Sequence, residues 1–341
     1  MTGTPPDSVA VFGHGEIIGD ALYKLPFVRA LRAAWPSSRI TWVTTNRTVY
    51  ASKLRPVTDG LIDEFRQDSG IGASPAGLIL PLPWRERFSV IIDTQTTVWR
   101  TLSLRRLPHG LFISPAARFR LSDRRPAPGR IRPPHMVDRL NELLELATGH
   151  APASRAELRL PEDLTAKAEA ALPPGPAYIG LAPGAGKRHK CWPLERFIAV
   201  AAAQVGRGRV PVFILGPDEL EWLKQIREAV PSALFPEQDK AIWGEGFSPL
   251  RTIALARRLT AALANDSGVS HMFGAADAPL LTLFGPTSAE KFQPKVTLGG
   301  VITAQEFGGD AMTDIPVQSV IERLDQVAIH RTEHGDYPKN R

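Results

Sequence analysis

A carboxylate, Asp20, ends a glycine-containing segment that begins at Gly13. Glycines let backbone N–H groups approach an anion closely, and a helix is expected to start nearby. Neither nucleotide-binding fingerprint fits, because Ile18 stands where a G-x-G-x-x-G pattern has its last glycine and no Lys-Ser/Thr pair of a P-loop follows. Asp20 is therefore either a functional carboxylate beside an anion-binding turn or an N-terminal cap of that helix.

A basic segment, residues 182–193, offers a second kind of chemistry. Its glycines, Gly184 and Gly186, free the backbone, and its cations could neutralise a diphosphate such as the leaving group of a nucleotide-dependent transfer. The cationic side chains are Lys187, Arg188, Lys190 and, when protonated, His189. The alternative is a basic surface loop in front of a helix that Pro193 begins.

A third segment, Asn265–His271, lies between a short apolar strand and a helix of small residues. A strand-to-helix turn of this kind aims N–H groups and the helix dipole at a bound anion. Alternatively, Asp266 and Ser267 cap the helix and His271 packs inside it. A fourth segment, Leu280–Thr287, is a buried strand that ends in a glycine-proline turn, and by itself it can be purely structural.

Strands and helices alternate along the chain and place these segments at strand ends. In the first half, apolar runs over 9–12, 40–44 and 89–93 predict buried strands, and the helical spacing over 21–34 predicts a helix that Pro36 closes. Strand, helix and strand in this rhythm predict a parallel α/β sheet.

The same alternation restarts after a proline-glycine cluster at 173–176. The expected strands are 177–181, 210–215, 262–264 and 280–284, and the expected helices are 197–204, 249–259, 272–276 and 317–329. We therefore predict domains over residues 1–172 and 173–316, followed by a C-terminal helix and a loose tail over 317–341.

The bulk composition limits the class of protein. With 341 residues, the chain is about twice a common domain length, and 43% apolar and 22% charged residues are ordinary for a soluble globular protein. No stretch approaches the roughly 20 apolar residues that span a bilayer, and residues 1–8 do not resemble a signal peptide, so we expect a cytoplasmic protein. Cys191 is the single cysteine, which excludes an internal disulfide and a thiolate metal cluster.

The formal charge of +6 is unevenly distributed. Between residues 100 and 132 many arginines face only one acidic residue, Asp123, so an anionic partner is one reading and a solvated basic face is the other. These arginines are Arg100, Arg105, Arg106, Arg118, Arg120, Arg124, Arg125, Arg130 and Arg132. Nucleic acid is not expected as the partner, because the stretch has few aromatic side chains for stacking and no zinc-finger or RNA-recognition pattern.

In their order and spacing, the segments together resemble the family-nine glycosyltransferases, the ADP-heptose:lipopolysaccharide heptosyltransferases. The matching pieces are Gly19-Asp20, Leu25-Pro26, Leu31-Arg32, Asp93-x-Gln95, Pro183-Gly184, Lys190-x-Trp192-Pro193, Gly216-Pro217-Asp218-Glu219, Asn265-Asp266-Ser267-Gly268 with His271, and Phe284-Gly285-Pro286-Thr287. The resemblance implies a GT-B fold, an α/β architecture of two Rossmann-like domains whose parallel sheets face each other across a cleft. The donor would lie mainly in the C-terminal domain and the acceptor would meet the N-terminal one.

The resemblance also implies roles for individual residues. Asp20 would be the general base that takes the proton from the acceptor hydroxyl as it attacks the anomeric carbon with inversion, with Gly19 keeping the approach clear. Lys190 would stabilise the charge on the departing diphosphate. The donor-binding residues implied are Gly184, Ala185, Gly186, Lys187, Glu219, Phe247, Asp266, Ser267, Gly268 and His271. The acceptor-binding residues expected are Gly19, Arg105, Arg106, Arg118 and Arg120.

By the same resemblance, the donor is a nucleotide sugar, ADP-heptose, and the acceptor is the anionic, lipid-linked core of lipopolysaccharide at the inner face of the cytoplasmic membrane. No cofactor is expected, and no metal, since an Asp-x-Asp motif is absent. Some family members carry hydroxyl residues where this chain has Ala185-Gly186, which leaves a relative with another nucleotide sugar as an alternative. A non-catalytic nucleotide-sugar-binding protein is a second alternative. A nicotinamide dehydrogenase is a third, and Ile18 argues against it.

Overall fold

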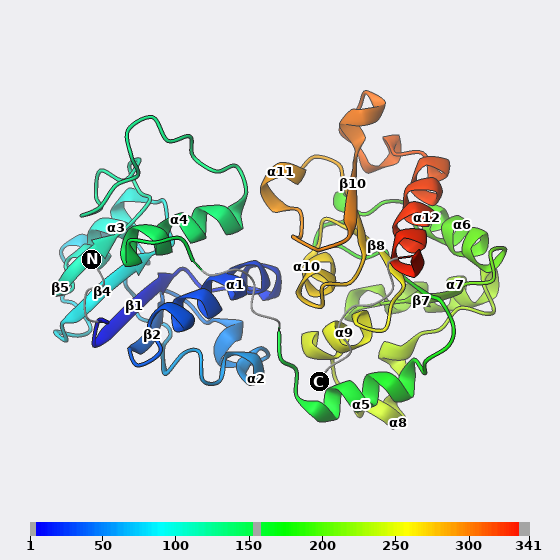
Figure 1. The fold of residues 1–341 in the computed structure, drawn as a ribbon, viewed down its shortest axis with the longest axis horizontal. Helices are drawn as coiled ribbons and strands as arrows, with labels where there is room; N and C mark the ends of the chain where they lie inside the picture. The colour runs from blue at the N-terminus through cyan, green and yellow to red at the C-terminus, as the bar shows by residue number, and fades with distance from the viewer. Residues whose placement is uncertain (1–4, 153–157, 334–341) are drawn as a thin grey trace. The chain divides into compact units, whose positions relative to one another are not determined.

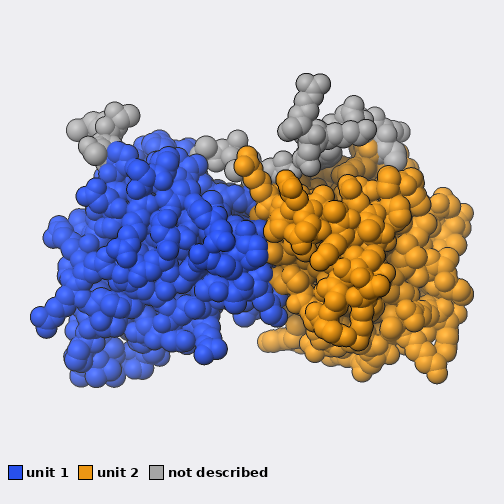
Figure 2. Space-filling view, turned by 90° about the horizontal axis from the view of Figure 1, so that it is seen from below, with its two compact units in different colours: residues 1–157 blue, residues 158–341 orange. Residues whose placement is uncertain are grey.

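A computed structural model describes residues 5–152 and 158–333 of the chain. The chain divides into two compact units, Met1–Glu157 (unit 1) and Leu158–Arg341 (unit 2), which Figure 2 shows in different colours. Each unit is built on a parallel sheet with helices between its strands. The predicted α/β class with a parallel sheet in each half is therefore confirmed.

In the described part of unit 1, five parallel strands form one sheet in the order β3-β2-β1-β4-β5. The strands are β1 (Ser8–Gly13), β2 (Arg39–Thr44), β3 (Glu64–Arg66), β4 (Phe88–Asp93) and β5 (His109–Ile113). The helices are α1 (Ile18–Ala34), α2 (Arg55–Thr58), α3 (Val98–Arg105) and α4 (Met136–Thr148), with the short 3-10 helices η1 (Val49–Ala51) and η2 (Pro75–Leu78) (Figure 1).

The central strand of unit 1 is β1, which pairs with β2 on one side and β4 on the other. Its apolar residues Val9–Phe12 are all fully buried, as expected for a parallel strand that helices cover on both faces. The chain leaves β1 toward β2 and later returns to the opposite side as β4. In doubly wound sheets ligands bind outside the carboxyl ends of the strands at such a switch point, and here Asp20 and Asp93 follow those ends.

In the described part of unit 2, a second set of five parallel strands has the order β10-β9-β8-β6-β7. The strands are β6 (Tyr178–Ala182), β7 (Val210–Phe213), β8 (Ala261–Asn265), β9 (Leu280–Phe284) and β10 (Gly299–Thr303). The α-helices are α5 (Glu162–Ala171), α6 (Leu194–Val205), α7 (Leu223–Ala229), α8 (Lys240–Trp243), α9 (Pro249–Ala256), α10 (Gly268–Ala275), α11 (Ala289–Phe292) and α12 (Val317–Glu333). The 3-10 helices are η3 (Arg188–Lys190), η4 (Pro217–Trp222), η5 (Pro236–Gln238), η6 (Ala304–Phe307) and η7 (Met312–Asp314).

Helices cover both faces of the unit 2 sheet. Along β6, Ile179 and Leu181 point into a core shared with α6 and α12, whereas Tyr178 and Ala182 point into a core shared with α5, α9 and α10. Successive side chains of a strand point to opposite faces, so the unbroken apolar run of β6 is explained by burial on both sides.

The two sheets share one topology. An isolated parallel bridge joins Val212 of β7 to Leu234, beyond the edge strand of the unit 2 sheet. When the unit 2 order is read from β7 to β10, Leu234 lies outside β7 as β3 lies outside β2 in unit 1. In the same reading, β6 and β8 take the places of β1 and β4. The repeat of the architecture that the sequence predicts is therefore present, with the switch point of unit 2 between β6 and β8.

The division between the units differs from the predicted boundary after residue 172, because it falls after Glu157. Helix α5 belongs to unit 2, since Ala168 and Leu172 are buried in the same core as Leu255 and Leu259 of the α9 region. The proline-glycine cluster at 173–176 is thus a turn between α5 and β6 rather than a linker between units.

The C-terminal helix is also part of unit 2. Val320 and Leu324 of α12 are fully buried in the core beneath α6 and the sheet, so residues 317–333 are an integral element rather than an appendage. The helix continues to Glu333, beyond the predicted end at residue 329, and the rest of the predicted tail lies outside the described residues. Among the helices described, none is both long and apolar enough to cross a membrane.

Candidate active site

In unit 2, one buried amide joins the loops that follow β6 and β8. The side chain of Asn265 is fully buried. Its Oδ1 accepts a hydrogen bond from Trp192 N at 3.1 Å, and its Nδ2 donates to Pro183 O at 2.8 Å. Because both ends of the amide bond to backbone, the basic segment is held in a fixed register against the Asp266 loop.

A second contact joins a third loop to the same place. Asp266 Oδ2 accepts hydrogen bonds from Lys190 Nζ at 2.6 Å and from Thr287 Oγ1 at 2.7 Å. The side chain of Asp266 is 10% exposed and that of Lys190 is 25% exposed. Lys190 and Asp266, 76 positions apart, thus form one charged pair at the carboxyl ends of β6, β8 and β9.

The N-terminus of α10 lies in this loop cluster. Ser267 is the residue before the helix and makes no capping hydrogen bond with its side chain. Its Oγ is buried and has no hydrogen-bond partner among the described residues. A Cβ at Gly268 would meet nothing within 4 Å. Ser267 is nevertheless the N-cap residue of α10, and its N–H donates to Ser270 Oγ at 3.4 Å as in a capping box, so the capping alternative holds in part for Ser267 and not for Asp266. The start of α10 offers N–H groups and the Ser267 hydroxyl to an anion.

Glu219 lies against the glycines of two loops. An added Cβ at Gly184 would stand 2.3 Å from Glu219 Oε1, and one at Gly216 would stand 2.8 Å from Glu219 Oε2. Burial, together with the neighbouring charge of Asp218, raises the pKa of Glu219. Gly184 makes room for the Glu219 carboxylate, which would have to move if position 184 carried a side chain, whereas a Cβ at Gly186 would meet nothing within 4 Å.

The other predicted donor residues of unit 2 lie around this cluster. Lys187 is exposed and Ala185 is half-buried, both in the loop after β6. Arg188 turns away to pair with Glu221 and stacks on Trp222 at 4.6 Å. The half-buried Phe247 precedes α9, and the half-buried His271 is in the first half of α10.

In unit 1, Asp20 is in the first turn of α1, directly after Gly19. The residue before the helix is Ile17, and the helix start has no side-chain cap, so Asp20 is not an N-cap. Asp20 is half-buried, and its carboxylate accepts no hydrogen bond from any residue that the structure describes. Burial raises the pKa of Asp20, Lys24 lowers it, and Glu16 raises it.

A buried ion pair lies beside Asp20. Lys24 Nζ donates to Glu16 Oε1 at 2.9 Å, with side chains that are 8% and 1% exposed. Trp42 Nε1 donates to Glu16 Oε2 at 3.2 Å. Burial opposes ionisation of Glu16, but Lys24 and the hydrogen bonds outweigh it, so the pKa of Glu16 is lowered.

Asp93, at the carboxyl end of β4, is fully buried and bonded on both oxygens. Oδ1 accepts from Gln95 N at 2.8 Å, and Oδ2 accepts from Thr101 Oγ1 at 2.6 Å and Ser114 Oγ at 2.8 Å. Burial raises its pKa to about 6 despite these bonds. In the Asp93-x-Gln95 piece of the sequence pattern, the Asp93 carboxylate thus joins β4 to α3 and to the loop after β5 through hydrogen bonds.

The arginine-rich stretch separates into two groups. Arg105 donates to Asp123 Oδ1 at 2.6 Å and to Leu121 O, and Arg106 donates to the carbonyls of Gly77 and Leu80. These guanidinium groups hold unit 1 loops together. Arg130 pairs with Glu142 and Glu145 of α4. These glutamates lie outside residues 100–132, so the charge balance of that stretch alone does not include them.

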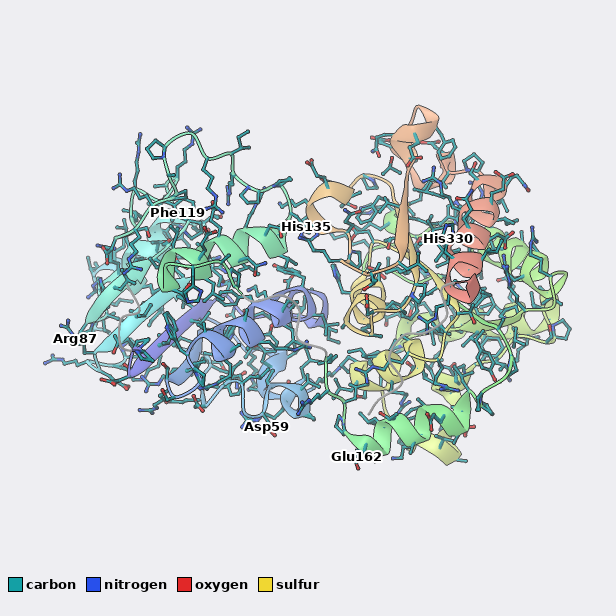
Figure 3. All side chains as sticks on the ribbon, in the orientation of Figure 1. Asp59, Arg87, Phe119, His135, Glu162 and His330 are labelled. Carbon is teal, nitrogen blue, oxygen red and sulfur yellow. The ribbon has the colours of Figure 1, made fainter. Side chains whose placement is uncertain are left out.

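Arg118 and Arg120 are exposed instead, and within the described ranges their side chains make no ion pair. They lie on a turn after β5, where Figure 3 labels Phe119. Ala117, Arg118 and Phe119 are all left-handed, with φ of 50°, 55° and 62°. Non-glycine residues are sterically strained in the left-handed region, and strained residues of this kind are concentrated at functional sites.

The chain matches the model of glycosyltransferase family 9 (heptosyltransferase) over residues 84–307, more than half of its 341 residues. The chain belongs to glycosyltransferase family 9. The matched range includes Lys190, Glu219 and the Asp266 loop but begins after Asp20, so the role of Asp20 depends on the Gly19-Asp20 resemblance and on its own geometry.

A curated heptosyltransferase is similar to part of this family-9 chain. Lipooligosaccharide heptosyltransferase 2 of Haemophilus influenzae is 28% identical over 165 residues, which cover 44% of this chain and 46% of that protein. The matched part thus spans less than half the length of that curated relative.

Among solved structures, a family 9 glycosyl transferase from Veillonella parvula has a TM-score of 0.70 at 20% identity, covering 95% of this chain and 97% of that one. The E. coli ADP-heptose lipopolysaccharide heptosyltransferase II has a TM-score of 0.67 at 20% identity, covering 95% and 99%. These likenesses confirm the GT-B fold.

Sequence reasoning did not single out two residues near Asp20 in this family-9 chain, Glu16 and His14. The Nε2 atom of His14 lies 3.3 Å from Arg100 Nη2 and 3.4 Å from Asn46 Nδ2, and its buried Nδ1 has no partner among the described residues. Burial and Arg100 lower the pKa of His14. Since both neighbours of Nε2 are donors, the neutral ring carries its proton on Nδ1. The position directly after β1 was the only signal available in the sequence.

Proposed function

We propose that this family-9 chain is an inverting, metal-independent glycosyltransferase that moves heptose from ADP-heptose to a lipopolysaccharide core acceptor. The observation that carries the proposal is the charged cluster of unit 2 at the N-terminus of α10. It consists of Lys190, Asp266 and Ser267 Oγ, which has no hydrogen-bond partner in the part of the chain that the structure describes. The named activity of the E. coli structure supports ADP-heptose as the donor.

On the donor side, the diphosphate binds at the start of α10. Anions are stabilised at a helix N-terminus because N–H groups without a helical partner and the helix dipole point at them. Lys190 Nζ, held by Asp266 Oδ2 at 2.6 Å, contributes the positive charge that grows in importance as the diphosphate departs. Asp266 keeps further acceptor capacity for hydroxyls of the sugar, and Glu219 for those of the ribose.

On the acceptor side, Asp20 takes the proton of the attacking hydroxyl. A general base needs a lone pair that is free and a pKa closer to the working pH than that of an exposed carboxylate. Asp20 meets both needs, because its carboxylate has no hydrogen bond from the described residues and burial raises its pKa. Among the acceptor arginines expected from sequence, Arg118 and Arg120 are the better candidates, because Arg105 and Arg106 are engaged in unit 1 loops.

Metal independence is part of this proposal, because cationic and N–H groups of unit 2 can serve the diphosphate without a metal ion. Lys190 and the N–H groups of α10 supply the charge that a metal would otherwise supply to the diphosphate.

Donor binding is the direct test of this proposal. A ligand that binds only the native state raises the melting temperature, so we expect ADP-heptose at saturating concentration to raise it, and UDP- and GDP-sugars to do so much less. The Ser267→Ala variant should bind ADP-heptose at least about tenfold more weakly, since a hydrogen bond to a charged group contributes about 1.5 kcal/mol or more. A shift produced only by a UDP- or GDP-sugar would contradict the donor assignment.

A further inference from the structure

Helix α1 carries two opposite charges one turn apart. Asp20 and Lys24 stand at positions i and i+4, where an acidic residue followed by a basic one ordinarily forms a surface pair. Here Lys24 Nζ instead donates to Glu16 Oε1 at 2.9 Å, and no hydrogen bond joins Lys24 to Asp20. The lysine that is best placed to bind Asp20 is therefore bound elsewhere.

The carboxylate of Glu16 is held firmly in that role. Trp42 Nε1 donates to its second oxygen at 3.2 Å. An added Cβ at Gly13 would stand 2.2 Å from Glu16 Oε1, so the glycine at the end of β1 makes room for this carboxylate. The loop between β1 and α1 thus places the Glu16 carboxylate in the interior, where it binds Lys24.

Both partners are nearly removed from water, with the Lys24 side chain 8% exposed and the Glu16 side chain 1% exposed. A buried charge whose partner is removed is strongly unfavourable. Without Glu16, the ammonium of Lys24 would need another anion, and Asp20 is the carboxylate one turn away on the same helix.

We propose that Glu16 is a positioning residue that binds Lys24 and so keeps the carboxylate of Asp20 free to accept a proton. This inference rests on the proposed function, because it takes Asp20 as the general base. A pair between Lys24 and Asp20 would occupy the lone pairs that the acceptor hydroxyl needs, and it would weaken the base.

The two charges of the buried pair have opposite effects on Asp20. Burial raises its pKa, Lys24 lowers it and Glu16 raises it. Tyr23 and Tyr50, which also lie near, have raised pKa values because of burial and remain neutral. Helix α4 packs along α1. Its charged side chains are Asp138, Arg139, Glu142 and Glu145, of which the two glutamates pair with Arg130 and Arg139 donates to Pro133 O.

The test is a direct titration of Asp20. The carboxyl pKa is measured by NMR in protein labelled with 13C at the aspartate side chains, with the Asp20 signal assigned by its loss in Asp20→Asn. Glu16→Gln should lower the Asp20 pKa, because it removes a negative charge and releases Lys24 toward Asp20. The double variant Glu16→Gln with Lys24→Met should return it to the wild-type value or above, because the competing cation is gone. Glu64→Gln, which removes a carboxylate at the β2–β3 edge, is the matched control and should leave it unchanged.

Turnover gives a second readout. We expect Glu16→Gln to lower kcat about tenfold, a fraction of what a general base contributes, and to move the acid limb of the pH–rate profile to lower pH. The double variant should recover most of the loss. An Asp20 pKa that stays constant or rises in Glu16→Gln, or a double variant no better than Glu16→Gln, would overturn the inference.

Two safeguards keep the result interpretable. If Glu16→Gln does not fold, Lys24→Met alone still tests the coupling, because removing the cation should raise the Asp20 pKa, and an unchanged value would refute the inference. The titration needs no turnover. Full activity in Asp20→Asn would show that Asp20 is not the base, even if Glu16→Gln lowers the Asp20 pKa as expected. An Asp20 pKa that does not change in Glu16→Gln would refute the role of Glu16 and leave Asp20 as the proposed base.

Discussion

Lys190 and Asp266 each depend on the other. The ammonium is fixed by the carboxylate at 2.6 Å, and Thr287 Oγ1 donates to the same oxygen at 2.7 Å. With Asp266 only 10% exposed, loss of the cation would leave a largely desolvated carboxylate beside the proposed diphosphate site, where it would repel the donor.

The first prediction concerns this pair. Lys190→Met should lower kcat about hundredfold, because it removes a positive charge aimed at the leaving group and leaves the charge of Asp266 uncompensated. Steady-state kinetics with ADP-heptose measure it. Lys224→Met is the matched control, since Lys224 is 87% exposed and pairs with Glu228 on the surface. A Lys190→Met enzyme that changed only in KM would show that the lysine binds the donor without acting on the departure of the diphosphate.

At the scale of elements, the ends of the parallel strands create the site. Four loops of unit 2, after β6, β7, β8 and β9, contribute Gly184, Glu219, Asp266 and Thr287. The loops after β6 and β7 pack together, because the Glu219 carboxylate occupies the space beside Gly184 and Gly216 where a side chain would stand.

A glycine pair tests that fit. In Gly184→Ala the new Cβ would stand 2.3 Å from Glu219 Oε1, so the glutamate must move away from its place over the loop. We expect the KM for ADP-heptose to rise about tenfold, which corresponds to about 1.4 kcal/mol of lost binding. Gly186→Ala, two residues on with open space around its Cβ, should change KM less than twofold. Equal effects of the two substitutions would argue against the assigned position of Glu219.

Asp93 sets a pH dependence of stability at the end of β4. Its pKa is about 6 in the folded protein and about 4 in an unfolded chain. The folded state therefore holds the proton that the unfolded state has lost between pH 4 and 6, and the free energy of unfolding falls as the pH rises through this window. The full effect is about 3 kcal/mol. In urea titrations at pH 4 to 7, Asp93→Asn should gain stability relative to wild type by about that amount. A constant difference across the window would contradict the raised pKa.

Much of the element pattern could be predicted because burial leaves a mark in the sequence. The strand Leu280–Phe284 has the predicted bounds, since every residue in it is apolar or a buried threonine. Strands β3 and β5 were not predicted, because their polar residues Glu64, Arg66 and His109 occur on short strands near the sheet edge. Helix α5 was missed for a similar reason, since Ala168 is its single fully buried residue.

At the scale of the whole molecule, the chain repeats one doubly wound topology in two units and uses the switch point of each. Unit 1 presents Asp20 and Asp93 there, and unit 2 presents the Asp266 loop. Family membership and the fold follow from comparisons that cover most of the chain. The chemistry proposed for each unit depends on the sequence resemblance together with the geometry of that unit.

The candidate site could be predicted only in part for a physical reason. Sequence spacing identified Asp20, Lys190 and Asp266 as members of separate segments, and helix capping was a competing reading for two of them. Only three-dimensional contacts show that Lys190 binds Asp266 across 76 positions, or that Glu16 takes Lys24 away from Asp20. Equally, only the structure shows that Arg105 and Arg106 bind loops of unit 1.

The central claim is that this family-9 chain transfers a sugar with Asp20 as the base. The most direct measurement compares wild type with Asp20→Asn for transfer from ADP-heptose to a lipopolysaccharide core acceptor in the presence of EDTA, with donor binding measured by calorimetry on the same samples. We predict metal-free transfer by wild type, a loss of kcat of at least about a hundredfold in Asp20→Asn, and nearly unchanged donor affinity. Near-normal turnover by Asp20→Asn would contradict the role of Asp20 as the base. Loss of wild-type activity in EDTA would contradict metal-independent transfer.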